Sequence, residues 1–329
     1  MENYRTLFHI PESEHKITYE TPLFFIGSCF TENIGKKLEE LKFQVEINPF
    51  GVIYNPFSVK NSLEMLMDDK VFTAEDLYHF NDQWISFYHQ TSFSDPDLEN
   101  CLQHINDKNR RASAFLKKAE FLFITFGTAR IFEWKETGQV VSNCHKIPAS
   151  KFARKLLSPE EITEMYISLV QDLTDFNPGL KIIFTVSPVR HWKDGATGNQ
   201  ISKSVLLVAI HSLLEHFPQN LYFPAYEIVM DDLRDYRFYA EDMLHLNKTA
   251  VDYIWDKFEN TFIDKENRAI TKEIRQLVLA MSHRPMKSDS ESHRKFLKAN
   301  LEKVIQLQKR FPFLDVRKEI DYFSGKNQE

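Results

Sequence analysis

The sequence predicts an α/β protein in which one parallel β-sheet carries helices on both faces. Two observations indicate this fold. Short apolar runs alternate along the chain with amphipathic stretches, which is the pattern of parallel strands joined by helices. The chain also has 329 residues, 43% of them hydrophobic and 27% charged, which is enough to bury the core of one large domain.

Five apolar runs have the length of buried strands. They predict strands at residues 23–26, 43–47, 121–126 and 181–186, and a weaker strand at 221–223. We expect a doubly wound sheet with the strand order 2-1-3-4-5. That order places the first and third strands beside the crevice in which ligands usually bind.

The ends of two helices can be read from the sequence. Ser158 and Glu161 form a capping box around a proline at the first helical position, which predicts a helix that ends at residues 177–179. The apolar residues after Asn247 recur at helical spacing. They predict the last helix of the α/β domain.

The second and third predicted strands are separated by a long connection. Ser58 predicts the start of a helix to about Asp69, and residues 94–96 predict the start of another that runs toward Glu120. Ordinary crossovers need only about a dozen residues. We therefore expect residues 56–120 to form an insertion, which is a candidate cap over the site.

Two further regions complete the predicted domain plan. Residues 131–141 are expected to form a β-hairpin that turns at Gly138. The chain beyond this region returns to the α/β pattern as far as residue 264, so we assign residues 1–264 to one α/β domain. Residues 265–329 are rich in charge and carry an apolar helical stripe, which predicts a helical C-terminal extension.

Residues 27–30, with the sequence Gly-Ser-Cys-Phe, lie directly after the first predicted strand and before a helix. A nucleophile placed at such a turn faces the positive end of the helix dipole and its unpaired N–H groups. Ser28 is therefore the predicted nucleophile for acyl transfer. Cys29 is an alternative, because helix N-termini favour thiolates, but we expect its side chain to point into the core.

Asp242 and His245 supply the other groups that a serine hydrolase needs. At this spacing the carboxylate can accept a hydrogen bond from the imidazole Nδ1 while Nε2 faces the nucleophile. Asp76 and His79 have the same spacing, so the spacing alone is not specific. The first pair is favoured because it follows the last strand, at the edge of the sheet where the Ser28 turn is expected.

Backbone N–H groups for an oxyanion hole are expected after neighbouring strands. Gly51 follows the second predicted strand and has no side chain to shield its N–H. Thr128 follows the third and would face Ser28 across the crevice.

The overall composition excludes several classes of function. The formal net charge is −6 and the pI is about 6.1, so we expect no nucleic-acid partner. Three cysteines without CxxC spacing indicate neither a disulfide framework nor a zinc site, and we expect no metal and no cofactor. The chain lacks a signal-peptide pattern and a run of about twenty apolar residues, which predicts a cytoplasmic protein without a membrane span.

A set of short motifs resembles the GSCFA-domain family, a group related to the SGNH (GDSL-like) esterases and acyl hydrolases. In chain order they are Gly-Ser-Cys-Phe at 27–30, Asn-Pro-Phe-Gly at 48–51, Gly-Thr-Ala-Arg at 127–130, Asn-Cys-His-Lys at 143–146, Ser-Pro-Val-Arg-His at 187–191 and Asp-x-x-His at 242–245. The resemblance implies a three-layer α/β/α, flavodoxin-like fold. It also implies a Ser28–His245–Asp242 triad, with the N–H groups of Ser28 and Gly51 in the oxyanion hole.

The chain departs from the SGNH pattern at one functional position. SGNH enzymes usually place an asparagine side chain in the oxyanion hole within a Gly-x-Asn block, where this chain has Gly-Thr-Ala. Loss of one donor costs about 3 kcal/mol of transition-state stabilisation. The candidate replacements are Thr128, Asn48, Asn55 and Asn143.

Asn48, Asn55 and Asn143 are also candidates for substrate binding, and so are three more residues. His89 and His145 are possible pocket residues or metal ligands, although neither has metal-ligand spacing and a structural role is favoured. Arg190 follows the fourth predicted strand, where it can hold a carboxylate or phosphate, or pair with a nearby aspartate.

These observations predict a serine esterase that removes a short acyl group, such as O-acetyl, from a sugar or small metabolite. An acyltransferase that uses the same triad is a close alternative. An inactive SGNH-like binding module is a second alternative, motivated by the missing asparagine. The sequence gives no oligomeric state.

Overall fold

The computed structural model describes residues 6–282 and 290–325. Its centre is a five-stranded sheet with the order β10-β9-β5-β1-β2, in which every pair of neighbours is parallel. The predicted fold class and strand order are confirmed. The strands are β1 (Leu23–Gly27), β2 (Val45–Ile47), β5 (Phe121–Phe126), β9 (Lys181–Val186) and β10 (Leu221–Tyr222).

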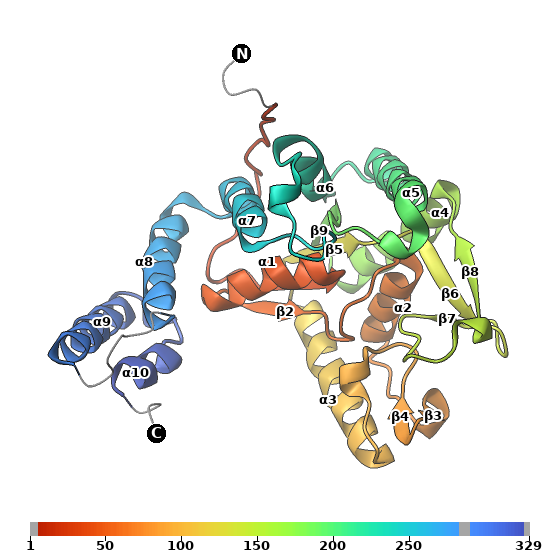
Figure 1. The fold of residues 1–329 in the computed structure, drawn as a ribbon, viewed down its shortest axis with the longest axis horizontal. Coiled ribbons are helices and arrows are strands. Elements are labelled where there is room, and N and C mark those ends of the chain that lie inside the picture. The colour runs from red at the N-terminus through yellow and green to blue at the C-terminus, as the bar shows by residue number, and fades with distance from the viewer. Residues whose placement is uncertain (1–5, 283–289, 326–329) are drawn as a thin grey trace.

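Helices cover both faces of this sheet because alternate strand residues point to opposite sides. Phe24 and Ile26 of β1 join the apolar cluster under one layer, whereas Leu23 and Phe25 join the cluster under the other. The first layer contains α2 (Pro56–Met67), α3 (Leu98–Leu116), α4 (Pro159–Phe176) and α5 (Gly195–His216). The second contains α1 (Cys29–Glu40) and α7 (Lys248–Phe262) (Figure 1).

Polar side chains fix where these helices begin. The capping box of Ser158 and Glu161 forms at the start of α4 as predicted. The helix predicted from Ser58 begins earlier, at Pro56, because the Asn55 side chain accepts the Ser58 N–H at 2.8 Å. Likewise α3 begins at Leu98 rather than near residue 94.

The long connection contributes mostly to the helical layer. Its helices α2 and α3 pack on the sheet, and between them β3 (Tyr78–Phe80) and β4 (Gln83–Ile85) form an antiparallel hairpin. A second small sheet lies beyond β5. It has the order β7-β6-β8 and consists of β6 (Arg130–Trp134), β7 (Val140–Val141) and β8 (Phe152–Leu156). The hairpin predicted at Gly138 joins β6 to β7, and β8 was not predicted.

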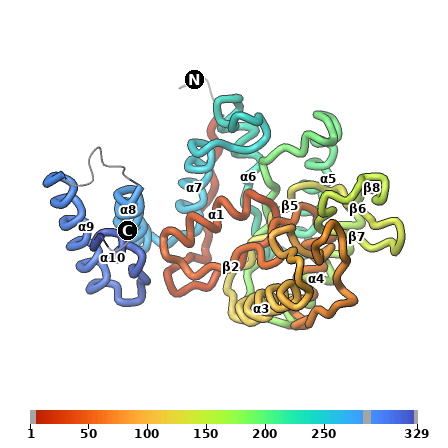
Figure 2. The backbone as a smooth tube through the Cα atoms, turned by 60° about the horizontal axis from the view of Figure 1, so that its bottom comes forward, coloured from red at the N-terminus to blue at the C-terminus, as the bar shows by residue number. Residues whose placement is uncertain are grey.

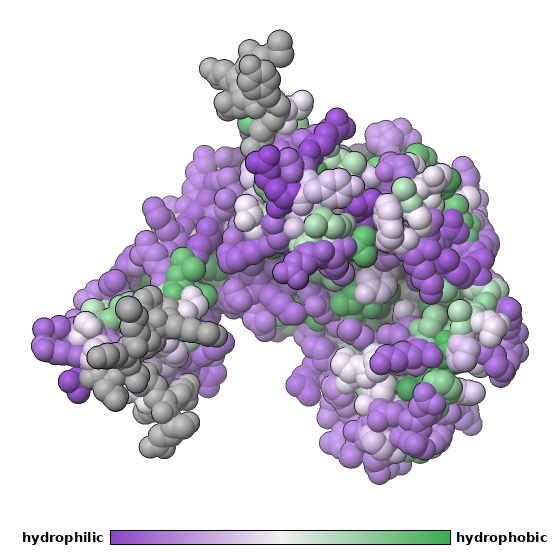
Figure 3. Space-filling model, viewed as in Figure 1, coloured by the Kyte–Doolittle hydropathy of each residue, from purple (hydrophilic) through white to green (hydrophobic). Residues whose placement is uncertain are grey.

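The C-terminal helices form a group at one end of the molecule, opposite the β6–β8 sheet (Figures 1 and 2). They are α8 (Lys265–Met281), α9 (Glu291–Arg310) and α10 (Arg317–Phe323). Their apolar residues continue the cluster beneath α1 and α7, and the buried Glu319 of α10 pairs with Lys42 at 2.7 Å. The face seen in Figure 3 is mainly hydrophilic. Within the described ranges, every helix is too short or too polar to cross a bilayer.

The β1–α1 turn depends on a glycine. Gly27 has φ +137°, and a Cβ placed on it would lie 2.1 Å from the carbonyl oxygen of Thr125 on β5. Only a residue without a side chain allows the chain to turn this close to the neighbouring strand.

The substitution Gly27→Ala should therefore lower the free energy of unfolding by more than about 3 kcal/mol, measured by urea denaturation. Gly138→Ala is the matched control, because Gly138 also has positive φ but no atom lies within 4 Å of an added Cβ. Its expected cost is about 1 kcal/mol. Equal costs for the two variants would contradict this account of the turn.

Candidate active site

The β1–α1 turn is held by hydrogen bonds to β5 and to the residue that follows β2. The Gly27 N–H donates to Asn48 Oδ1 at 2.8 Å, and the Ser28 N–H donates to Thr125 O at 3.2 Å. The Ser28 hydroxyl is the N-cap of α1, since it accepts the Phe30 N–H at 3.3 Å. Ser28 is only 1% exposed. The predicted nucleophile is thus a buried helix cap in this structure.

Asp242 and His245 form a hydrogen-bonded pair on an exposed turn before α7. Asp242 Oδ1 accepts the N–H groups of Leu244 and His245, each at 2.9 Å, and Oδ2 accepts from the imidazole Nδ1 at 2.6 Å. These bonds, above all the one from the imidazole, lower the pKa of the Asp242 carboxyl to about 2. The carboxylate is therefore ionised at neutral pH, and it orients the ring through Nδ1.

A cavity of about 430 Å³ lies between the β1–α1 turn and the β6–β8 sheet. We call it the turn cavity. Cys29 and His245 both line it, as do Tyr54, Asn55 and Thr128. The remaining wall comes from β6, β7, β8 and the loops that follow β7 and β9. Among the described residues, the structure brings the predicted base and the first residue of α1 to one cavity.

Ser28 and Cys29 do not point in the directions that the sequence predicted. Ser28 does not line the turn cavity, and among the described residues no hydrogen bond joins it to His245. Cys29 is half-buried and lines the cavity, so the expectation that its side chain points into the core is wrong. The reason is the N-cap: the Ser28 hydroxyl turns back toward the helix N–H groups, and the next side chain faces the cavity.

The predicted oxyanion donors are already engaged. The Gly51 N–H donates to Asn48 O at 2.7 Å within a tight turn, and Gly51 does not line the turn cavity. The Gly127 and Thr128 N–H groups both donate to Tyr54 O, at 2.7 and 3.0 Å. Thr128 lines the turn cavity, and its hydroxyl shares a 3.0 Å hydrogen bond with Ser202 and accepts the Arg130 N–H at 3.1 Å. The role of Thr128 in an oxyanion hole stays a prediction.

The three asparagines proposed as replacement donors have different positions. Asn48 is buried away from the turn cavity, where its Oδ1 accepts from Gly27. Asn55 and Asn143 line the cavity, but the Asn55 side chain caps α2 and Asn143 Oδ1 accepts the His145 N–H at 2.8 Å. Asn143 keeps its side-chain amide as a donor.

His89 and His145 are structural residues, and neither lines the turn cavity. His89 is 2% exposed, stacks on Phe50 with ring centroids 4.6 Å apart, and shares a 2.8 Å hydrogen bond with Ser86 Oγ. His145 Nε2 donates to Ser86 O at 2.8 Å. Burial lowers the pKa of His89 to about 3 and also lowers that of His145. Both rings are therefore packed within the protein outside the turn cavity, and substrate binding by this pair stays a prediction.

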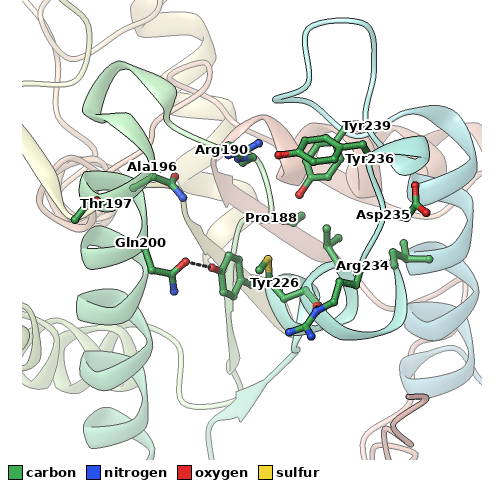
Figure 4. A pocket seen from close by; sticks show the side chains of 14 residues that line it. Pro188, Arg190, Ala196, Thr197, Gln200, Tyr226, Arg234, Asp235, Tyr236 and Tyr239 are labelled. Carbon is green, nitrogen blue, oxygen red and sulfur yellow. Dashed lines mark hydrogen bonds between the residues drawn. The ribbon is translucent and has the colours of Figure 1, made fainter. Parts of the chain in front are cut away.

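Arg190 lies between the turn cavity and a second cavity of about 610 Å³, which it also lines. Figure 4 shows Tyr226, Tyr236 and Tyr239 around this second space, which we call the tyrosine cavity. The Arg190 guanidinium stacks on Trp192, 4.2 Å from the ring centroid. Arg190 thus lies at the junction of the two cavities, and its contact with substrate stays a prediction.

A buried lysine beneath the turn was not predicted. Lys203 of α5 is 1% exposed, and its Nζ donates to Gly127 O at 2.7 Å and to Ser187 O at 2.5 Å. Burial lowers the pKa of Lys203 to about 7. The available signal was its place on the apolar face of a helix, three residues before Leu206.

His191 also lies against the turn. A Cβ placed on Gly127 would lie 2.9 Å from its Nε2, and its ring packs edge-on against Tyr54. Burial, and next the charge of Lys203, lower the pKa of His191 to about 4. His191 is therefore neutral at physiological pH.

Comparison with family models identifies the chain. The model of the GSCFA family matches residues 22–258, which contain the turn, the cavity walls and the Asp242–His245 pair. The chain belongs to the GSCFA family. The model of the C-terminal domain of GSCFA domain proteins matches residues 274–329. The family predicted from the motifs is confirmed.

This GSCFA protein has distant likeness to three solved structures, each with a TM-score of 0.37. One is provisionally described as a platelet activating factor from Streptococcus pneumonia, with 12% identity over 73% of this chain and 83% of the other. A carbohydrate esterase family 3 protein from Talaromyces cellulolyticus has 7% identity, over 78% and 99%. A protein provisionally described as an acylhydrolase, from Bacteroides fragilis NCTC 9343, has 11% identity, over 79% and 91%. The comparison with curated proteins gave no match.

The burial of His89 should make the free energy of unfolding of the GSCFA protein depend on pH. Its pKa is about 3 in the folded chain, where burial and the nearby His145 and His104 disfavour the charged ring, against about 6.5 when unfolded. Between these values the unfolded chain binds the extra proton, so the free energy of unfolding falls as the pH falls.

We expect wild type to lose about 2 kcal/mol more than His89→Phe between pH 7 and pH 5, measured by urea denaturation at each pH. The comparison uses only the change with pH, so any cost of losing the Ser86 hydrogen bond cancels. The same pH dependence in both proteins would show that His89 is protonated in the folded state.

Proposed function

We propose that this protein is an acyl hydrolase that cleaves an ester through an acyl-enzyme formed at the β1–α1 turn. One observation carries the proposal: the imidazole of His245, oriented by Asp242 at 2.6 Å, lines the same cavity as the N-terminus of α1. A base with an aspartate partner, a nucleophile at the turn and the positive end of a helix are the parts that acyl transfer needs.

Each group has a defined task in this proposal. His245 takes the proton of the nucleophile through Nε2 and later returns it to the leaving alcohol. Asp242 fixes the tautomer in which Nδ1 carries hydrogen and stabilises the imidazolium that forms. The N-terminus of α1 and the Thr128 hydroxyl face the developing oxyanion.

The walls of the turn cavity favour a polar or anionic substrate. Arg130 and Arg154 both pair with Asp194, so one carboxylate faces two guanidinium groups. Arg190 and Lys193 line the same cavity and add two further positive charges. An acylated sugar or small metabolite with an acidic group would meet complementary charge there.

The tyrosine cavity supports transfer to an acceptor other than water as a second candidate function. It adjoins the turn cavity at Arg190, and its tyrosine rings offer flat apolar faces with hydroxyl groups. A sugar or other alcohol bound there would compete with water for the acyl-enzyme. An excess of transferred product over hydrolysed product, measured with an added alcohol, distinguishes the transferase.

The proposal predicts that His245→Ala lowers kcat for a short-chain aryl ester by about 10²- to 10⁴-fold with little change in KM, because the variant lacks only the base. His79→Ala is the matched control, since His79 follows Asp76 at the same spacing but lies on the β3–β4 hairpin. It should keep wild-type turnover. Undiminished turnover in His245→Ala would remove His245 as the base, whereas no turnover in folded wild type would favour a binding module without catalysis.

A further inference from the structure

We propose that the nucleophile of this protein is the thiol of Cys29 and not the hydroxyl of Ser28. The inference rests on the proposed function and names the atom that carries the acyl group. The acyl-enzyme is then a thioester at the first residue of α1.

The first argument is the direction of the two side chains. Ser28 is 1% exposed, its oxygen accepts the Phe30 N–H, and its Cβ lies 3.4 Å from the position of a Cβ on Gly127. Cys29 lines the turn cavity together with His245. For Ser28 to attack a substrate in this cavity, its hydroxyl would have to leave the helix cap and the packing against the β5 end. Cys29 needs no such change.

The second argument is the environment of the sulfur. Cys29 is the first residue of α1, and the N–H groups of Cys29 and Phe30 act to lower the pKa of its thiol. Lys203 acts in the same direction. Its Nζ contacts two carbonyl oxygens, and no ion pair joins it to a carboxylate within the described ranges. A buried cation without a counter-ion stabilises an anion formed beside it.

The Cys29 thiol is protonated in the resting protein, so it needs His245 as a base. Burial raises the pKa of the Cys29 thiol, while Lys203 and the helix N–H groups oppose that rise and Glu32 adds to it. The thiol is therefore protonated at neutral pH. It needs a base to become a nucleophile, and His245, whose Nδ1 is bonded to Asp242, lines the same cavity.

The reaction balances without a further reagent. His245 Nε2 takes the thiol proton as the C–S bond forms on the ester carbonyl, and the tetrahedral oxyanion collapses with cleavage of the C–O bond. The imidazolium gives its proton to the leaving alcohol. A water then gives a proton to Nε2 and attacks the thioester carbonyl, the C–S bond breaks, and the imidazolium returns its proton to the sulfur.

Cys144 provides an internal comparison within the wild-type chain. It lines the same turn cavity and burial also raises the pKa of its thiol, but it lies in the loop after β7 rather than at a helix N-terminus. Cys101 is fully buried in the core. Differences in reactivity between Cys29 and Cys144 thus report the helix terminus, Lys203 and His245 rather than access to the cavity.

The test combines alkylation with turnover. Wild type is treated with iodoacetamide, and the rate at each cysteine is followed by peptide mass spectrometry. We expect Cys29 to react at least about tenfold faster than Cys144, and the His245→Ala substitution to slow Cys29 without slowing Cys144. Alkylation of Cys29 no faster than of Cys144 would overturn the proposal.

Turnover of a short-chain aryl ester by Cys29 and Ser28 variants shows which of the two side chains carries the acyl group. Cys29→Ala should lower kcat/KM by at least about 10²-fold, whereas Ser28→Ala should lower it by less than tenfold. Ser28→Gly is the second variant, because glycine is tolerated at a helix N-cap and the chain then still folds if the alanine variant does not. Acid-quenched wild type should carry the acyl group on Cys29, released by neutral hydroxylamine.

The opposite pattern of turnover would overturn the inference. Turnover that persists in Cys29→Ala but is lost in both Ser28 variants, with the acyl group on Ser28, would overturn the inference and leave the proposed hydrolase intact. Absence of turnover in wild type, with Cys29 alkylated rapidly in a His245-dependent manner, would instead count against the ester substrate and support the nucleophile.

Discussion

The candidate site depends on the close approach of the β1–α1 turn to the end of β5. Gly27 passes so near the Thr125 carbonyl that a side chain cannot be accommodated, and the Ser28 N–H then bonds to that same carbonyl. Asn48, held in a left-handed conformation at φ +43°, ties the turn to the end of β2. These contacts fix the direction in which α1 leaves the sheet, and with it the side chain that faces the cavity.

Burial of charge beneath this turn is the second constraint. Lys203 is held by two backbone carbonyls and not by a carboxylate, and burial lowers its pKa to about 7. Burial of an ammonium without a counter-ion costs stability. In the proposed chemistry that charge lies near the sulfur that would carry the acyl group, so the same lysine would oppose folding and favour the reaction.

Much of the fold was predictable because its strands are continuous apolar runs. The strands 121–126 and 181–186 were predicted to the residue, since both are buried on two faces. The strand β8 was missed because Arg154 and Lys155 are exposed and it pairs only with β6. For the site, the Asp242–His245 contact followed from local spacing. The directions of Ser28 and Cys29 did not, because they depend on which group caps α1, and the core position of His89 depends on aromatic rings from distant segments.

The way in which their turn holds Asp242 and His245 bears on which nucleophile the imidazole can serve. Both partners, and the N–H groups that fix them, belong to one short stretch of chain closed by the Ala240–His245 hydrogen bond. The pair is therefore formed within its own turn, which a hydrogen bond from the Arg190 N–H to the Leu244 carbonyl joins to the loop after β9. In the proposed chemistry, an imidazole held in this way would serve a sulfur or an oxygen nucleophile alike.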